Sequence, residues 1–159
     1  MSATSSVDDT HDAEAVASVT DPLRPLWHSD AEPVKAIADS CWGDAAPTLK
    51  FYNRAAESGF SWVRVDCDGE VEGAACSILI PCGCLGFPAN CYIVDISVLA
   101  VREESRRKGI GKSLMNAVLD MARSEDECCS VQLNVDVANE GARHLYESCG
   151  FQIVGDVLN

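Results

Sequence analysis

The stretch VDISVLAVREESRRKGIGKSLMNAVLDMA, residues 94–122, joins an apolar run, a cationic loop and an amphipathic segment. The apolar run, which begins at Cys91, is β-rich and long enough to cross a sheet. From Ile110 to Ala122 apolar residues recur at helical spacing. Three cations, Arg106 to Lys108, stand in front of Gly109 and Gly111. The stretch predicts a strand, a basic turn and a helix, in that order.

The basic turn favours an anionic ligand. Glycines at a helix start expose backbone N–H groups, and these groups together with the helix macrodipole attract negative charge. Five of the 12 Lys and Arg residues fall between 102 and 112, although the net charge of the chain is −13. The ending Gly111-Lys112-Ser113 matches a P-loop, but the first glycine of that motif is replaced by Arg106. We therefore expect a pyrophosphate rather than a P-loop nucleotide; a solvated basic turn is the simpler alternative.

Patterns on both sides of this stretch predict the other elements, in the order β-α-α-β-β-β-α-β-α-β. Asp68-Gly69 predicts a hairpin turn between two of the strands. The expected strands are 23–28, 60–67, 71–80, 91–101, 130–135 and 151–158. The expected helices run from Ser29 or Asp30 to about Trp42, over 48–58, over 110–122, and from a cap at Asn139 to Gly150. This order describes an α/β (α+β) fold with a mixed sheet flanked by helices.

Length and composition limit the class of protein. With 159 residues the chain is expected to form one domain, 23–159, after an acidic segment, 1–22, that is expected to be disordered. No apolar run is long enough for a membrane span, and the N-terminus has no secretory or transit pattern, which indicates a cytoplasmic or nucleocytoplasmic protein without a membrane partner. The strongly negative net charge argues against direct binding of nucleic acid.

The nine cysteines are expected to be free thiols. Their number is odd, and the expected compartment is reducing. Cys82, Cys84 and Cys91 do not have the spacing of paired zinc ligands, and no histidine lies near them in the sequence. We expect no metal.

Residues 94–122 and the segment VQLNVDVANEGARHLYESCGFQIVG, residues 131–155, carry a family resemblance. The first contains L-x-V followed by R-x-x-G-x-G, and the second contains N-x-x-A-x-x-L-Y-x-x-x-G-F. Together they resemble the two central motifs of the Gcn5-related N-acetyltransferases (GNAT superfamily). The details are most similar to the amino-terminal protein acetyltransferases, of the ribosomal-protein and nascent-chain types.

The resemblance implies a GNAT fold that binds acetyl-CoA without a metal. It implies a mostly antiparallel sheet in which two central strands splay and hold the pantetheine arm. Tyr146 would be the general acid that protonates the leaving thiolate. Leu99 and Val101 would contact the pantetheine of acetyl-CoA, and Asn139 would contact pantetheine or cap its helix. The implied pyrophosphate contacts are Arg106, Arg107, Lys108, Gly109, Ile110, Gly111 and Lys112.

The resemblance leaves more than one candidate for the general base. The strand position where related amino-terminal acetyltransferases often carry Glu or His holds Asn134, and an amide cannot take a proton. Asp95 stands where the histone acetyltransferases of the superfamily carry a glutamate base, and strand alternation places it on one side with Ser97 and Leu99. Asp95 is a candidate base, a candidate anchor for the substrate amine, or a structural residue; Tyr92 is a weaker candidate base.

The resemblance implies transfer of an acetyl group to a primary amine, with a protein N-terminal α-amine as the first candidate. The acceptor is then a protein or peptide, with an auxiliary subunit or the ribosome as further partners. The alternatives are a small-molecule amine or lysine acetyltransferase and a non-catalytic acyl-CoA-binding regulatory protein. The expected C-terminal hairpin is missing before Asn159, so we expect either a fragment or shortened form with a truncated hairpin, or an incomplete acceptor groove.

Overall fold

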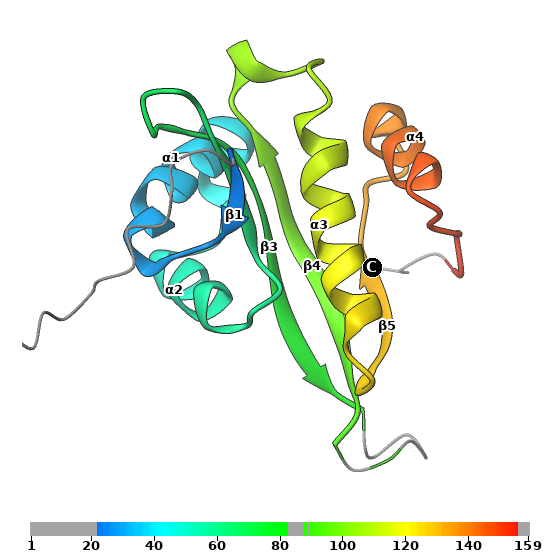
Figure 1. Cartoon of the computed structure of the whole chain (residues 1–159). Helices are drawn as coiled ribbons and strands as arrows, with labels where there is room; N and C mark the ends of the chain where they lie inside the picture. The colour runs from blue at the N-terminus through cyan, green and yellow to red at the C-terminus, as the bar shows by residue number, and fades with distance from the viewer. Residues whose placement is uncertain (1–21, 83–87, 89, 156–159) are drawn as a thin grey trace, which may run out of the picture.

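A computed structural model describes residues 22–82, 88 and 90–155 of the chain. It contains a five-stranded sheet in the order β1-β2-β3-β4-β5 (Figure 1). Neighbouring strands are antiparallel from β1 to β4, and β5 runs parallel to β4. The strands are β1 (Leu23–Pro25), β2 (Trp62–Val65), β3 (Val71–Pro81), β4 (Tyr92–Val101) and β5 (Cys128–Leu133). The mixed, mostly antiparallel sheet is the one the sequence predicts.

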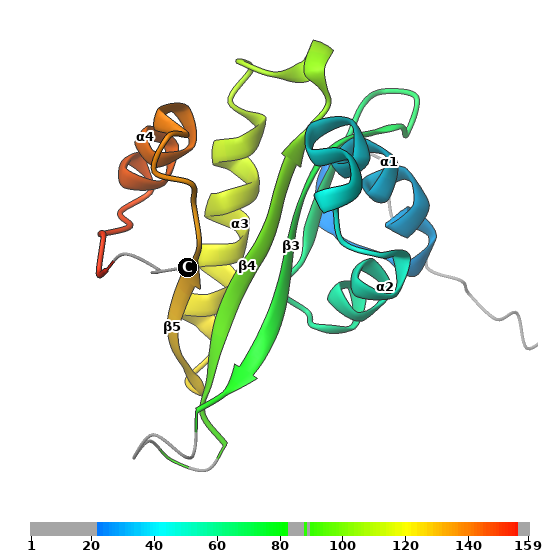
Figure 2. The same cartoon turned by 180° about the vertical axis from the view of Figure 1, so that it is seen from behind.

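Helices cover both faces of the sheet. Two of them, α1 (Ala31–Trp42) and α2 (Leu49–Glu57), lie on one face, and α3 (Ile110–Ser124) lies on the other with α4 (Glu140–Ser148) beside it (Figures 1 and 2). In the described part of the chain, short 3₁₀ turns connect elements at η1 (His28–Asp30), η2 (Gly43–Ala45) and η4 (Glu103–Ser105). No helix in the described ranges has the length and apolar character needed to cross a bilayer.

The sheet separates two apolar clusters. On the α1/α2 face, Val34, Ile37 and Tyr52 pack against buried residues of β2 and β3. On the α3 face, Leu114 and Val118 pack against β3, β4 and β5. Amphipathic helices that bury one stripe on either side of a sheet account for this arrangement.

A β-bulge at Ser97 changes the direction in which β4 side chains point. In the pairing of β3 with β4, Cys76 lies opposite Val98 and Ser77 opposite Ile96, so Ser97 is skipped. As a result Ile96 packs in the α3 cluster, whereas Val98 packs in the α1/α2 cluster. An extra residue in one strand has this effect because side chains alternate with period two. Asp95 precedes the bulge and Leu99 follows it, so the two side chains lie on different faces of the sheet. The expectation that they share a face is therefore wrong.

Some expected boundaries are also wrong. Residues 151–155 form no strand, contrary to the expected strand 151–158, whose last residues lie outside the described part of the chain. Residues 152–155 are exposed, and in the described structure they pair with none of the five strands. The first strand ends at Pro25, and the strand expected at 130–135 is Cys128–Leu133. The acidic segment 1–21 lies outside the described residues.

Candidate functional site

Strands β4 and β5 pair over only half of β4. The pairing joins Tyr92 to Ile96 with residues 128–133 and then ends, while β4 continues to Val101 beside β3. Leu99 and Val101 therefore lie where β4 has no pairing with β5, so their backbone groups on that edge have no strand partner. The divergence of these two strands is the splay that the resemblance implies.

The loop that follows β4 presents free backbone donors. Arg107 and Gly109 have positive φ angles of 63° and 78°, which turn the chain back into α3. Within the described residues, the backbone N–H groups of 107–112 donate to no acceptor, and the first bond of the helix is Ser113 N–H to the Gly109 carbonyl, 3.0 Å. Successive N–H groups in such a turn, at the start of a helix, form a concave anion-binding site.

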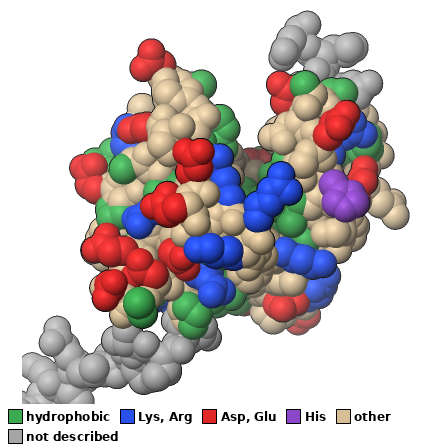
Figure 3. Space-filling view, turned by 90° about the horizontal axis from the view of Figure 1, so that it is seen from above, with side chains coloured by type: hydrophobic (Ala, Val, Ile, Leu, Met, Phe, Trp, Pro, Cys, Tyr) green, Lys and Arg blue, Asp and Glu red, His purple; other side chains and the backbone are tan. Residues whose placement is uncertain are grey.

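The cations of the loop divide into two kinds. The Arg106 guanidinium is engaged: Nε donates to the Val101 carbonyl at 3.1 Å, and Nη2 donates to Cys41 Sγ at 3.4 Å. In the described structure the exposed side chains of Arg107, Lys108 and Lys112 make no hydrogen bond or ion pair, so their charge is available to a ligand. Figure 3 shows this end of the molecule, where Lys and Arg side chains gather around a hollow between two lobes.

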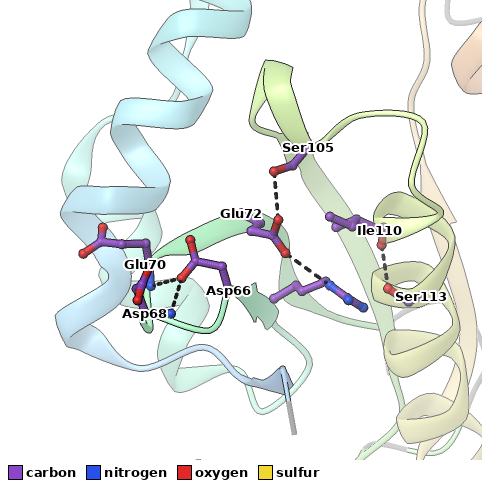
Figure 4. A network of polar contacts seen from close by, with 8 residues as sticks. Asp66, Asp68, Glu70, Glu72, Ser105, Ile110 and Ser113 are labelled. Carbon is purple, nitrogen blue, oxygen red and sulfur yellow. Dashed lines mark hydrogen bonds and ion pairs between the residues drawn. The ribbon is translucent and has the colours of Figure 1, made fainter.

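Glu72 of β3 anchors the loop to the sheet. Its Oε1 accepts a hydrogen bond from Ser105 Oγ at 2.9 Å, and its Oε2 pairs with Arg64 Nε at 3.4 Å (Figure 4). Its carbonyl also accepts from the Arg102 N–H at 2.8 Å. Ser105 is 4% exposed, so its hydrogen bond with Glu72 is largely shielded from water, whereas the Arg64 side chain is 34% exposed. Sequence reasoning missed Glu72, because nothing near it in the chain points to residue 105.

The two glycines of the loop have different roles. A Cβ on Gly109 would meet nothing within 4 Å, so glycine is required there by the positive φ. A Cβ on Gly111 would lie 3.2 Å from Leu145 Cδ2, so this glycine allows α4 to approach α3 closely. The buried Ile110 between them anchors the first turn of α3 in the apolar cluster.

Helix α4 carries two of the sequence-predicted site residues. Asn139 caps it, because its side-chain Oδ1 accepts the Ala142 N–H at 3.1 Å. Tyr146 is half-buried and packs edge-on against Phe151, with ring centroids 6.1 Å apart. Burial raises the pKa of the Tyr146 phenol and Cys149 adds to the rise, so the phenol is protonated at neutral pH and can donate a proton.

Asp95 is held by two neighbours that sequence reasoning did not assign to the site. Its Oδ2 accepts from Ser97 Oγ at 2.7 Å, and its Oδ1 accepts from Gln132 Nε2 of β5 at 3.1 Å. Asp95 is directly opposite Gln132 in the β4–β5 register, one residue before the last pair. The carboxylate therefore lies where the strands begin to diverge. Asn134, just beyond β5, is exposed.

This arrangement defines a class of protein: a splayed central sheet with a cationic, amide-lined loop at the start of a helix. Residues 23–151 match the family model described as the acetyltransferase (GNAT) family, and the chain belongs to this family.

Individual relatives are more distant. The chain is 26% identical over 146 residues to N-alpha-acetyltransferase 60 of Danio rerio, covering 82% of this chain and 59% of that protein. It is 32% identical over 134 residues to N-acetyltransferase 8 of Mus musculus, covering 82% and 55%. The chain thus spans little more than half the length of these curated relatives.

Two solved structures from Arabidopsis thaliana are similar in fold. Naa50 in complex with the bisubstrate analogue CoA-Ac-MVNAL superposes with a TM-score of 0.70 at 26% identity, covering 84% of this chain and 83% of that one. NAA60 in complex with acetyl-CoA gives a TM-score of 0.72 at 23% identity, covering 84% and 87%, which supports the fold alone.

Proposed function

We propose that this chain is an acetyl-CoA-dependent N-acetyltransferase that acts on a primary amine, the N-terminal α-amine of a protein. The observation that carries the proposal is the row of free backbone N–H groups at 107–112, placed directly after the strand that diverges from its neighbour. A diphosphate with an extended amide-containing arm matches both parts: its charge suits the loop, and its amides suit the open strand edge.

The acetyl-CoA contacts follow from this placement. The N–H groups of 107–112 bind the pyrophosphate, and Arg107, Lys108 and Lys112 add positive charge. The pantetheine amides pair with the open edge of β4 at Leu99 and Val101. Asn139 uses its Oδ1 for the helix cap, and its Nδ2 remains available to the pantetheine. Arg106, which is expected among the pyrophosphate contacts, also ties the loop to the Val101 carbonyl and to Cys41 of α1.

The chemistry requires an attacking neutral amine and a protonated leaving group. The amine nitrogen forms a bond to the thioester carbonyl carbon, the C–S bond breaks, and the amine loses a proton. Asp95, on the α1/α2 face, accepts this proton, and Tyr146, on the α3 face, protonates the departing sulfur. A base and an acid on opposite faces suit an amine that approaches from one side and a thiolate that leaves toward the other.

A protein N-terminus is the favoured acceptor for two reasons. An α-amine, with a pKa of about 7.7–8.0, is partly neutral at physiological pH, so it depends less on a strong base than lysine does. In addition, the Naa50 structure holds a bisubstrate analogue in which CoA is joined to the peptide MVNAL. We infer a cytoplasmic enzyme to which the ribosome or an auxiliary subunit presents nascent chains.

The test is release of the CoA thiol from acetyl-CoA in the presence of an acceptor panel. The panel contains peptides with free α-amines, the same peptides with blocked N-termini and an internal lysine, and polyamines. Turnover with the free α-amine peptides supports the proposal. Turnover only with lysine peptides or polyamines would contradict an α-amine acceptor and assign a lysine or small-molecule amine as the acceptor instead. Binding of CoA without turnover on any amine would leave a regulatory CoA-binding protein, the reading that Asn134 favours.

The substitution Asp95→Asn tests the base. The amide keeps the shape of the carboxylate but cannot take a proton, so kcat is expected to fall by about 100-fold at pH 7 and to recover as rising pH deprotonates the amine. An increase in KM for the amine at constant kcat would instead assign Asp95 as an anchor. Asp120→Asn on the exposed face of α3 is the matched control. Full activity in Asp95→Asn would remove Asp95 from the mechanism.

A further inference from the structure

Two thiols from distant parts of the chain meet at the paired end of the sheet, away from the proposed donor site. Cys82 directly follows β3, and Cys129 is the second residue of β5. Their Sγ atoms lie 3.5 Å apart. The Cys82 N–H donates to the Cys91 carbonyl at 3.0 Å, which holds the end of β3 beside the start of β4. The two sulfurs therefore meet across the strand that separates β3 from β5.

The two thiols differ in access to solvent. Cys82 is 0% exposed, whereas Cys129 is exposed. Both are free, and among the described residues no group of three or more side chains is arranged to hold a metal ion. A small oxidant in solution can therefore reach Cys129, and the fully buried thiol in contact with Cys129 is Cys82. An exposed thiol backed by a buried one in contact is the arrangement of an attacking and a resolving cysteine.

We propose that Cys82 and Cys129 form a redox site, in which peroxide converts the two thiols into an intrachain disulfide that joins β3 to β5. The Cys129 thiolate attacks one oxygen of hydrogen peroxide, the O–O bond breaks, and a sulfenic acid and water result. The Cys82 thiolate then attacks the sulfenic sulfur, the S–S bond forms, and the hydroxyl leaves as a second water. The two sulfurs together lose two electrons and two protons, and peroxide is reduced to two waters.

The crosslink would close a loop of chain that contains the proposed donor site. The two cysteines are 47 positions apart, and β4, the cationic loop and α3 all lie between them. Closing a loop of this length restricts the unfolded chain, so the oxidised protein is expected to melt at a Tm higher by about 5–10 °C. The crosslink also holds the paired end of β4 and β5, from which the two strands diverge.

The oxidation should depend on pH. Desolvation raises the pKa of the Cys129 thiol, and its hydrogen bond with Cys82 adds to the rise, whereas its hydrogen bond with Cys91 lowers it. The thiolate is the reactive form, so crosslinking is expected to be slow at pH 7 and to accelerate as the pH rises.

Peptide mapping tests the proposal on the full chain. The protein is treated with hydrogen peroxide, alkylated under denaturing conditions, and digested without reduction for mass spectrometry. The expected result is a peptide pair joined through Cys82 and Cys129, and a Tm rise that dithiothreitol reverses. Cys129→Ser is expected to abolish both, with Cys82 still available to alkylation.

Matched variants make the outcome decisive. Cys67→Ser removes an exposed thiol in the β2–β3 turn and is expected to change neither the crosslink nor the Tm shift. Cys91→Ser removes the third thiol near Cys129 and is also expected to leave the crosslink in place. A disulfide between Cys129 and Cys91 or Cys84, or conversion of Cys129 to sulfinic acid with Cys82 still reduced, would overturn the proposal.

Discussion

At the scale of single residues, Arg107 and Gly109 shape the loop that the proposed donor binds. A side chain at positive φ costs about 1–2 kcal/mol, a cost that glycine avoids. Gly109 could be predicted from the sequence, because glycine before a helix is a common turn signal. The left-handed conformation of Arg107 could not be predicted, because arginine rarely adopts it and only the closure of the loop between β4 and α3 requires it.

Gly109→Ala is the test at this scale. The substitution is expected to lower the free energy of unfolding by about 1 kcal/mol, through strain at φ 78°, and to raise the KM for acetyl-CoA about 5–10-fold by turning the N–H groups away. Gly59→Ala is the matched control, since Gly59 has φ 75° and equally open surroundings outside the loop. A KM rise of the same size in both variants would contradict the role of the loop.

At the scale of elements, the position of the loop depends on strands that are distant in sequence. Glu72 of β3 holds Ser105 and Arg102, and the bulge at Ser97 sets which face each β4 side chain meets. The sequence predicts both strands and the hairpin, because alternation and the Asp68-Gly69 turn are local signals. It does not predict the bulge, because the skipped residue becomes evident only when β4 is paired with β3.

Glu72→Ala tests the anchor. Loss of the Ser105 hydrogen bond and the Arg64 ion pair is expected to lower the free energy of unfolding by about 1–2 kcal/mol and to raise the KM for acetyl-CoA about threefold with little change in kcat. Both are measured by chemical denaturation and steady-state kinetics. Glu70→Ala, two residues earlier and exposed, is the control that should change neither. An unchanged KM in Glu72→Ala would show that the loop keeps its position without the anchor.

At the scale of the whole molecule, two apolar clusters on opposite faces of the sheet stabilise the fold. Burial raises the pKa of the Cys76 thiol from its ordinary value of 9.0 to about 12. Burial also raises the pKa of the Tyr52 phenol to about 12, with smaller contributions from Cys76, Asp39 and Cys41. The folded state therefore holds these protons at pH values where the unfolded chain releases them. The stability that follows is fully present below pH 9 and is lost as the pH rises from about 9 toward 12.

Cys76→Ala should reduce this pH dependence. Between pH 8 and pH 10 the wild-type chain is expected to lose about 1 kcal/mol of stability through Cys76, equivalent to a few degrees in Tm, and the alanine variant should lose that much less. Cys67→Ala, at an exposed thiol, should follow the wild-type profile. Thermal melts across this range check the result, and parallel profiles for wild type and Cys76→Ala would contradict it.

The sequence by itself determined the family, the order of the elements through α4 and the cationic loop, because these depend on local signals: helical and strand periodicity, glycines and a cap. Asn139 as the cap of α4 and Ile110 as the buried start of α3 follow from such signals and are found in the structure. The tertiary structure decided the rest. It set the face on which Asp95 lies and its contact with Gln132, and it engaged the side chain of Arg106. It also formed the Glu72 anchor and the contact of Cys82 with Cys129. Each of these joins residues from different strands or loops, and only the pairing and packing of the sheet bring such residues together.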